Sequence, residues 1–284
     1  CGHLTRQSPG SPREEIFVKS LKPLRSLLAV AMTALSFSAL AASELTVYTA
    51  LEPEDLSKYA ARFNQDHPDV KINWVRDSTG VITARLLAEK ANPQADAVWG
   101  LAATSLKLLQ QDGMLESYAA KNAEQLKPLF RDSQNPPQWI GMDAWMAAIC
   151  FNTVEAAKYN LPQPKTWQDL TNPVYTHSGS KPCKMAATGE APIGISFAYR
   201  GAKEKAAGAP LELIFPSEGL GWEMEAAGIL KGTKQLAAAQ TLMDWAASEK
   251  ANQLYNEGYA ILARPGIAKP VAHFPAEPEK LLIK

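Results

Sequence analysis

The chain has 284 residues, of which 46% are hydrophobic and 20% are charged, so it can form one large hydrophobic core or two smaller ones. Its 29 Lys and Arg balance 29 Asp and Glu, and this net charge of zero lacks the basic excess that binders of nucleic acid or anionic membranes use. The three Cys and four His match no metal-ligand spacing, so we expect neither a metal ion nor another cofactor.

Residues 1–41 have the order of features of a leader with a secretory signal peptide. Basic residues within 19–25 precede an apolar run over 26–37, and small residues follow at 39–41. This order predicts cleavage after residue 41 and export, whereas a buried N-terminal helix or a membrane anchor is the alternative. Cys1 begins a stretch unlike the start of a leader, which we interpret as translated upstream sequence. Without residues 1–41 the net charge is −3.

Export would place Cys150 and Cys183 in an oxidising compartment. These two cysteines can form one disulfide, and two buried free thiols are the open alternative.

The segments that follow the leader alternate between strand and helix patterns. Alternating, β-rich residues predict strands at 45–50, 70–75 and 96–99, and apolar residues at helical spacing predict helices at 52–64, 81–90 and 102–109. Strands and helices that alternate at these lengths favour parallel β-α units, so the predicted fold class is α/β.

The rest of the chain is less regular. A strand is predicted at 145–151, a helix from 152 to about 160, and a short helical turn at 166–170, whereas 171–190 shows no clear periodicity. Further strands are predicted at 193–197, 211–215 and 224–230, and further helices at 236–247 and 250–256.

Residues 77–81 predict an anion-binding site. Ser78, Thr79, Gly80 and Val81 start a helix directly after a strand, where free backbone N–H groups, hydroxyls and the helix dipole favour an anion. Thr104 repeats this arrangement after the next strand, at the sheet edge where open α/β sheets bind ligands. The alternative is an ordinary helix cap, for which Ser and Thr are also preferred.

Aromatic and acidic residues predict a site for an amine. Glu218 and Trp222 share a glycine-flanked loop, and a carboxylate beside an indole suits an ammonium group. A solvated turn is the alternative for this loop. Tyr48 and Tyr199 lie at predicted strand ends or in loops, where core packing is the alternative.

The sequence carries no motif of a serine hydrolase, a phosphate-binding loop, a zinc protease or a complete dinucleotide loop. This agrees with a binding protein and not with an enzyme.

Six segments carry a resemblance to a known family: ELTVYTA at 44–50, INWVRDSTGVITA at 72–84, NPQAD at 92–96, WGLAATS at 99–105, AICFNT at 148–153 and HSGSKPCK at 177–184. Through nearly all of 43–283, the chain resembles the periplasmic 2-aminoethylphosphonate-binding proteins of ABC importers. That family is similar to the ferric-ion-binding class of periplasmic solute-binding proteins.

The resemblance implies a type II periplasmic-binding-protein clamshell with two α/β lobes joined by two crossing strands, near 143–151 and 215–229. We call residues 43–142 with 225–284 the first lobe and residues 143–224 the second lobe. The implied protein is a monomer that binds a small phosphonate between the lobes and delivers it to a permease, with no role in nucleic-acid binding.

The resemblance also implies ligand-binding residues. A phosphonate would contact the helix start at 78–81, with Thr104 and, from the second lobe, Ser178 and Ser180. The amine would meet Asp143 or Glu218, with Tyr199 or Trp222 as a wall of the site. Tyr48 and Thr49, at the end of the first predicted strand, complete the predicted set.

The sequence also departs from the family pattern. A piece of the second lobe is expected between Tyr175 and Thr176, a terminal helix is expected after Lys284, and one Tyr at 199 stands where iron-binding relatives have a pair. The resemblance therefore implies an incomplete second lobe and disfavours iron. The alternatives are a binder of another small anion or of ferric ion, a phosphonate hydrolase, and a degraded copy without function.

Overall fold

A computed structural model describes residues 43–170 and 179–283 of the chain. The predicted leader, Ser178 and the junction after Tyr175 lie outside the described residues. The described residues belong to one compact unit, and none of its helices is long and apolar enough to cross a membrane.

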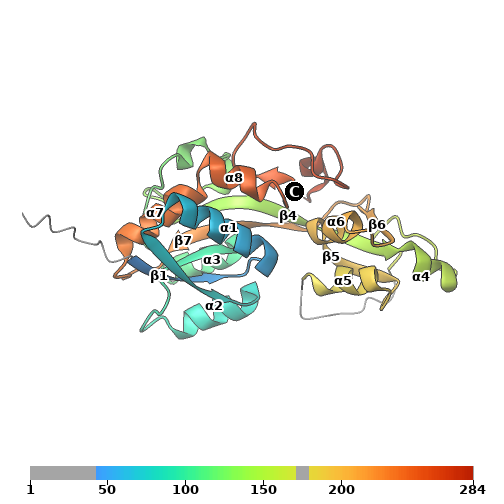
Figure 1. Ribbon diagram of the computed structural model, residues 1–284, viewed down its shortest axis with the longest axis horizontal. Helices are drawn as coiled ribbons and strands as arrows, with labels where there is room; N and C mark the ends of the chain where they lie inside the picture. The colour runs from blue at the N-terminus through green and yellow to red at the C-terminus, as the bar shows by residue number, and fades with distance from the viewer. Residues whose placement is uncertain (1–42, 171–178, 284) are drawn as a thin grey trace, which may run out of the picture. The chain divides into compact units, whose positions relative to one another are not determined.

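The sheet of the first lobe is built from the predicted β-α units, which the structure confirms (Figure 1). The first strand pairs in parallel with both of its neighbours, because a helix returns the chain to the same end of the sheet each time. The strands are β1 (Ser43–Thr49), β2 (Val70–Arg76) and β3 (Ala97–Ala102), and the helices are α1 (Pro53–Asp66), α2 (Thr79–Ala88) and α3 (Ala103–Gln111).

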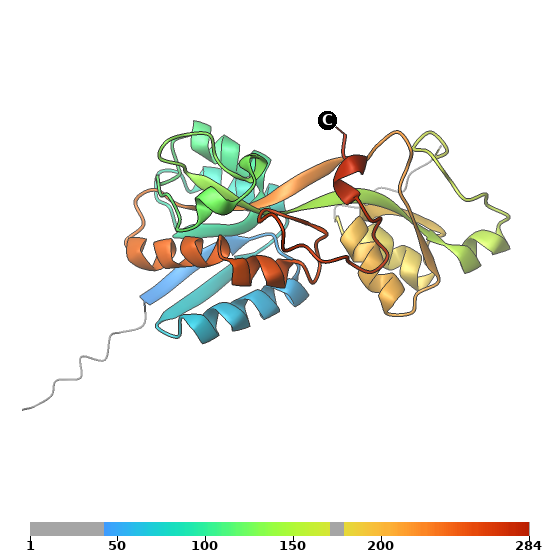
Figure 2. The same cartoon turned by 90° about the horizontal axis from the view of Figure 1, so that it is seen from above.

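Two long antiparallel strands, β4 (Trp139–Asn152) and β7 (Trp222–Ile229), run from the first lobe into the second (Figure 2). They coincide with the crossing segments that the resemblance implies, although β4 is longer than the strand predicted at 145–151. In the order β2-β1-β3-β7-β4-β5, β7 joins the parallel strands to β4. The far end of β4 pairs with β5 (Ile193–Phe197) and β6 (Leu211–Ile214), and its middle pairs with β8 (Ile261–Leu262).

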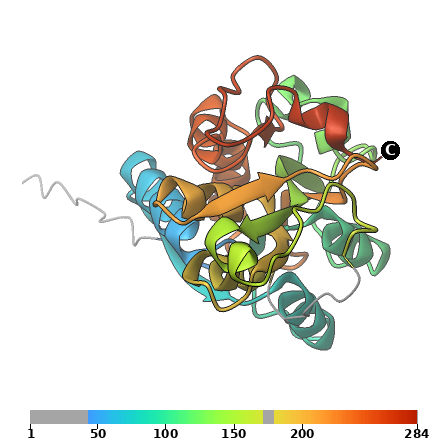
Figure 3. The ribbon, with the colours of Figure 1, turned by 90° about the vertical axis from the view of Figure 1, so that its right-hand side faces the viewer.

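Helices α4 (Thr153–Lys158), α5 (Lys181–Thr188) and α6 (Ala198–Ala206) belong to the second lobe, which faces the viewer in Figure 3. The sequence shows no periodicity across 171–190 and so predicts no regular element there, which is wrong for α5. This helix has Pro182 in its first turn and is capped by Gly189 in the left-handed conformation. At the predicted short helical turn, 166–170, the structure has a hydrogen-bonded turn and no helix, with the Leu170 N–H donating to the Trp167 carbonyl. That segment is a turn, in which Asp169 accepts hydrogen bonds from the backbone N–H groups of Lys165 and Thr166.

The main hydrophobic core lies in the first lobe, where aromatic rings of α1, β3, α7 (Leu236–Ala246) and α8 (Glu249–Tyr255) meet. Trp99 is fully buried and packs edge-on against Trp245, with ring centroids 5.4 Å apart. Short 3₁₀ helices complete the described elements, at Ala123–Gln125, Pro128–Phe130 and Pro278–Leu281.

The second lobe holds two small clusters of buried residues, one around Ile149 and Phe151 and one around Cys150 and Cys183. Cys150 and Cys183 form a disulfide between β4 and α5, with their Cα atoms 5.4 Å apart. The structure thus decides between the two alternatives for the cysteines in favour of the disulfide.

Candidate functional site

Three helices begin at one edge of the first-lobe sheet. Because β1, β2 and β3 are parallel, their carboxyl ends meet at this edge, and α1, α2 and α3 start there. The polar groups at these three helix starts form the candidate site.

The start of α2 presents unused hydrogen-bond donors, as predicted for an anion site. Ser78 is the N-cap residue, yet its side chain makes no capping hydrogen bond. The backbone N–H groups of Thr79, Gly80 and Val81 have no intrahelical acceptor, and no acceptor faces them within the described part of the chain. A Cβ added at Gly80 would meet only open space, so this helix start is open to an approaching ligand.

Thr104 lies exposed in the first turn of α3. Its neighbour Ser105 accepts a hydrogen bond of 2.9 Å from the Thr83 hydroxyl of α2. This bond joins the second turn of α2 to the first turn of α3.

Tyr48 and Thr49, at the end of β1, point into the protein and are fully buried. The Tyr48 hydroxyl donates to Glu89 just beyond α2, and burial together with Glu89 raises the pKa of Tyr48 to about 12. Thr49 Oγ1 accepts from the backbone N–H of Leu51. Tyr48 therefore ties β1 to the end of α2, and Thr49 supports the loop between β1 and α1.

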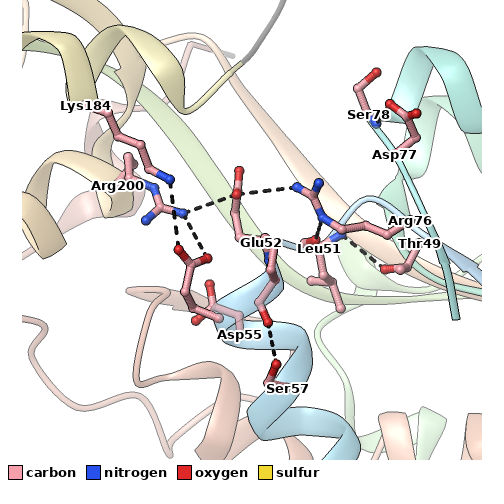
Figure 4. A network of polar contacts seen from close by, with 12 residues as sticks. Thr49, Leu51, Glu52, Asp55, Ser57, Arg76, Asp77, Ser78, Lys184 and Arg200 are labelled. Atoms are coloured by element: carbon pink, nitrogen blue, oxygen red, sulfur yellow. Dashed lines mark hydrogen bonds and ion pairs between the residues drawn. The ribbon is translucent and has the colours of Figure 1, made fainter.

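A network of charged residues joins the first lobe to the second (Figure 4). Glu52 Oε2, at the start of α1, lies 3.4 Å from Arg76 Nη2 of β2 and 3.3 Å from Arg200 Nη2 of α6. Arg200 also pairs with Glu54, at 3.7 Å, and Lys184 of α5 lies 3.9 Å from Glu54. The backbone N–H of Glu54 and the neighbouring cations lower the pKa of Glu54.

A second ion pair crosses between the lobes at the next turn of α1. Lys203 of α6 donates to both carboxylate oxygens of Asp55, at 2.6 and 2.7 Å. The start of α1 is thus acidic, and the facing parts of α5 and α6 are basic.

The sequence reasoning did not select these charged residues as site residues. The sequence did offer one signal, which is the acidic start of α1 at Glu52, Glu54 and Asp55. Acidic residues are common at helix starts because the helix dipole stabilises them there, so this signal alone did not indicate a site. Arg200 stood beside the selected Tyr199, but its partners lie 148 and 146 positions earlier in the chain.

Asp143 and Glu225 face each other across the two strands that join the lobes. They are directly paired in the β4–β7 register, and both are buried. Neither Asp143 oxygen has a hydrogen-bond partner among the described residues, whereas Glu225 Oε1 accepts from the Tyr259 hydroxyl at 3.0 Å. Burial raises the pKa of Asp143 well above its usual value and that of Glu225 to about 8.

Tyr199 belongs to the same buried group. Its ring lies 4.8 Å from the ring of Tyr259 and stacks on Phe197 at 5.5 Å, between centroids. Lys203 Nζ lies 5.4 Å from the centre of the Tyr199 ring. Tyr199 therefore connects the buried carboxylates to the interlobe ion pairs.

Glu218 and Trp222 have partners elsewhere. Glu218 is exposed and accepts from the backbone N–H of Trp167 at 2.8 Å. The indole N–H of Trp222 donates to the carbonyl oxygen of Ile283 at 2.9 Å. No contact among the described residues links these two side chains to the start of α2.

Ser180, the remaining second-lobe candidate, is buried at the N-cap of α5. The neighbouring Gly179 carbonyl accepts a short hydrogen bond from Ser196 of β5. This contact ties the start of α5 to the sheet, and Ser178 just before it lies outside the described residues.

Comparison with known proteins places the chain in a family. A model of the bacterial extracellular solute-binding proteins matches residues 49–176. An uncharacterized protein of Haemophilus influenzae is 30% identical over an alignment of 283 positions, gaps included. The alignment covers 83% of this chain and 81% of that protein. A probable ABC transporter periplasmic-binding protein of Sinorhizobium fredii is 29% identical, over 52% of this chain and 39% of that protein.

Among solved structures, the periplasmic binding protein AfuA of Actinobacillus pleuropneumoniae, with fructose 6-phosphate bound, is similar to this chain. The identity is 27% and the TM-score 0.76, over 85% of this chain and 91% of AfuA. The fold is therefore that of the type II periplasmic binding proteins. The chain belongs to the bacterial extracellular solute-binding proteins.

Proposed function

We propose that this protein is the receptor for 2-aminoethylphosphonate and delivers it, as a monomer, to the permease of an ABC importer. The observation that carries the proposal is the open start of α2, where three backbone N–H groups and two hydroxyls lack acceptors in the described structure. Such a helix start favours a phosphonate, because N–H donors and the helix dipole both stabilise negative charge.

In this proposal the phosphonate oxygens contact Ser78, Thr79, Gly80 and Val81, and the hydroxyl of Thr104 contributes a further donor. The hydrogen bond between Thr83 and Ser105 supports this arrangement, since it fixes the starts of α2 and α3 relative to each other. Ser180, at the N-cap of α5, and Ser178 are the contacts that we propose from the second lobe.

For the amine, we favour Asp143 over Glu218. Asp143 has no hydrogen-bond partner among the described residues, whereas Glu218 already accepts from Trp167. An ammonium group would give Asp143 a charged donor and lower its raised pKa. Tyr199 is then the aromatic wall, because it reaches the same buried group through Tyr259, while the Trp222 indole is bonded to Ile283.

A sugar phosphate is the second candidate ligand. AfuA, whose structure holds fructose 6-phosphate, is 27% identical to this chain. A phosphate ester presents the same kind of oxygens to the start of α2 as a phosphonate does, so this helix start fits both. The buried Asp143 favours the amine-bearing ligand.

We also propose that the second lobe lacks a segment after Tyr175. The family model stops matching at residue 176, next to this position. The alignment with the Haemophilus protein has 283 positions but contains only 83% of this chain. Some positions of the relative therefore have no counterpart in this chain, which supports a missing segment.

Replacing the hydroxyls at the start of α2 tests the proposed anion site. The S78A/T79A double variant should bind 2-aminoethylphosphonate at least about 10-fold more weakly by isothermal titration calorimetry, because hydrogen bonds to a charged group are lost. S57A is the matched control, since the Ser57 hydroxyl donates to Pro53 on the exposed side of α1. Unchanged affinity in the double variant would contradict the anion site.

A further inference from the structure

Arg200 is a buried cation whose donors are incompletely used. Its side chain is only 5% exposed, and neither Nε nor Nη2 makes a hydrogen bond among the described residues. Its carboxylate neighbours, Glu52, Glu54 and Glu204, all lie between 3.3 and 3.9 Å away. A guanidinium group has five donors in a fixed fork, and leaving such donors unmet in a buried place is costly.

Lys203, one turn further along α6, is in a different state. It donates to both oxygens of Asp55, so its charge is paired and two of its three N–H donors are used. Both cations pair with the start of α1, but among the described residues Arg200 is the one whose unused donors are buried, since its side chain is 5% exposed and that of Lys203 is 30% exposed. The contrast indicates that Lys203 holds the lobes together and that Arg200 has another partner.

Glu52 occupies the space between two guanidinium groups, with Arg76 on the first lobe and Arg200 on the second. Arg76 Nε is fixed by the carbonyl oxygen of Leu51 at 2.7 Å, and Arg76 lies two residues before Ser78. Glu52 therefore lies between cations of opposite lobes, while Glu54 and Glu204 also lie near Arg200. The chain runs from Arg76 directly to the start of α2. A tetrahedral anion would offer Arg200 the close hydrogen-bond acceptors that these carboxylates, at 3.3 to 3.9 Å, do not give to its Nε and Nη2.

We propose that Arg200 is the second-lobe residue that binds the acidic group of the ligand, and that Glu52 occupies its guanidinium when no ligand is bound. On binding, the Arg200 side chain leaves Glu52 and its guanidinium fork meets oxygens of the anion held at the start of α2, while the ion pair between Lys203 and Asp55 stays in place. Arg200 thereby contributes both affinity and selection for acidic ligands. This inference rests on the proposed function and names a further residue of the same site.

Calorimetric titration of four chains tests this role, with 2-aminoethylphosphonate and fructose 6-phosphate as probes. R200Q should bind whichever probe the wild type binds about 10- to 100-fold more weakly, because the charged guanidinium group of Arg200 is lost. E52Q should bind more tightly, since the internal competitor loses its charge. K203Q is the matched control, which breaks an ion pair between the same two helices and should stay within about threefold of the wild type.

The alternative is that the whole network is a structural link between the lobes. In that case R200Q and K203Q would change affinity equally, or E52Q would weaken binding as R200Q does, and either result overturns the proposal. If R200Q does not fold by circular dichroism, R200K keeps the charge without the fork and should still bind at least about fivefold more weakly. Wild-type protein that binds neither probe would refute the proposed function, whereas binding that is equal in R200Q and wild type would refute the role of Arg200 alone.

Discussion

Buried carboxylates are the most unusual residues of this protein. Asp143 and Glu225 lie opposite each other on the two strands that join the lobes, and α1, α6 and α8 bring further groups towards them. Among these groups, the carboxylates Asp55 and Glu52 raise the pKa of Glu225, whereas Lys203 and the Tyr259 hydroxyl lower it. Burial outweighs these contributions, so Glu225 holds a proton in the folded protein up to a pH of about 8.

The raised pKa of Glu225 predicts that the folded protein loses stability as the pH rises. In the unfolded chain Glu225 releases its proton near its ordinary pKa of 4.5, whereas the folded protein keeps it up to about 8. The folded state therefore binds the extra proton between these values, and its stabilising effect fades through that range. Thermal melts of E225Q should show a smaller fall in Tm between pH 5 and pH 8 than the wild type.

The matched control for this experiment is E223Q, a change on the same strand at a partly exposed carboxylate. It should keep the pH dependence of the wild type. Equal slopes of Tm against pH in wild type and E225Q would contradict the assignment of the proton to Glu225.

Local sequence signals located part of the site at the level of single residues. Ser78, Thr79, Gly80 and Val81 lie at a helix start as predicted, because caps and strand ends are encoded by a few neighbouring residues. The pairing of Glu52 with Arg200 could not be predicted in this way. It depends on how two distant segments meet, which neither spacing nor composition describes.

Among the elements, the first lobe was predictable because its strands and helices alternate with clear periodicity. Helices α5 and α6 were missed because both are short and rich in small or charged residues, so their apolar faces are narrow. Their stability comes from tertiary contacts: Cys183 of α5 bonds to β4, and a Cβ at Gly201 of α6 would come within 2.7 Å of Cys150 Sγ. Close packing around the disulfide thus stabilises α5 and α6, although their sequences carry only a weak helical pattern.

The disulfide should contribute measurably to the second lobe. It closes a loop with a sequence separation of 33, for which loop entropy predicts a stabilisation of about 3–4 kcal/mol. In urea, adding a reductant should shift unfolding of the oxidised chain to lower denaturant concentration. A chain carrying both C150A and C183A should not respond to the reductant.

The same unfolding curve tests the proposed missing segment. A second lobe that lacks part of its structure should unfold before the first lobe, in a separate transition that the reductant moves. A single transition without any response to reductant would contradict both the proposed gap and the role of the disulfide.

At the scale of the whole molecule, the resemblance predicted an extracellular solute-binding protein with the type II fold, and both are confirmed, whereas the specificity for 2-aminoethylphosphonate stays a prediction. The division into lobes at 142–143 and 224–225 stays a proposal. The continuous strands β4 and β7 give it a physical basis, since they carry the chain between the main core and the two small clusters of the second lobe. A family fold does not specify a ligand, which depends on a few side chains in the site.

Isothermal titration of 2-aminoethylphosphonate into the wild-type chain from residue 42 onward tests the central claim most directly. The account predicts saturable binding at one site per chain, tighter than that of fructose 6-phosphate, because only the aminophosphonate supplies both an anion for the start of α2 and an amine for Asp143. Saturable binding of fructose 6-phosphate with no heat from 2-aminoethylphosphonate would contradict the assigned ligand. Absence of binding by both compounds would contradict the proposed receptor function.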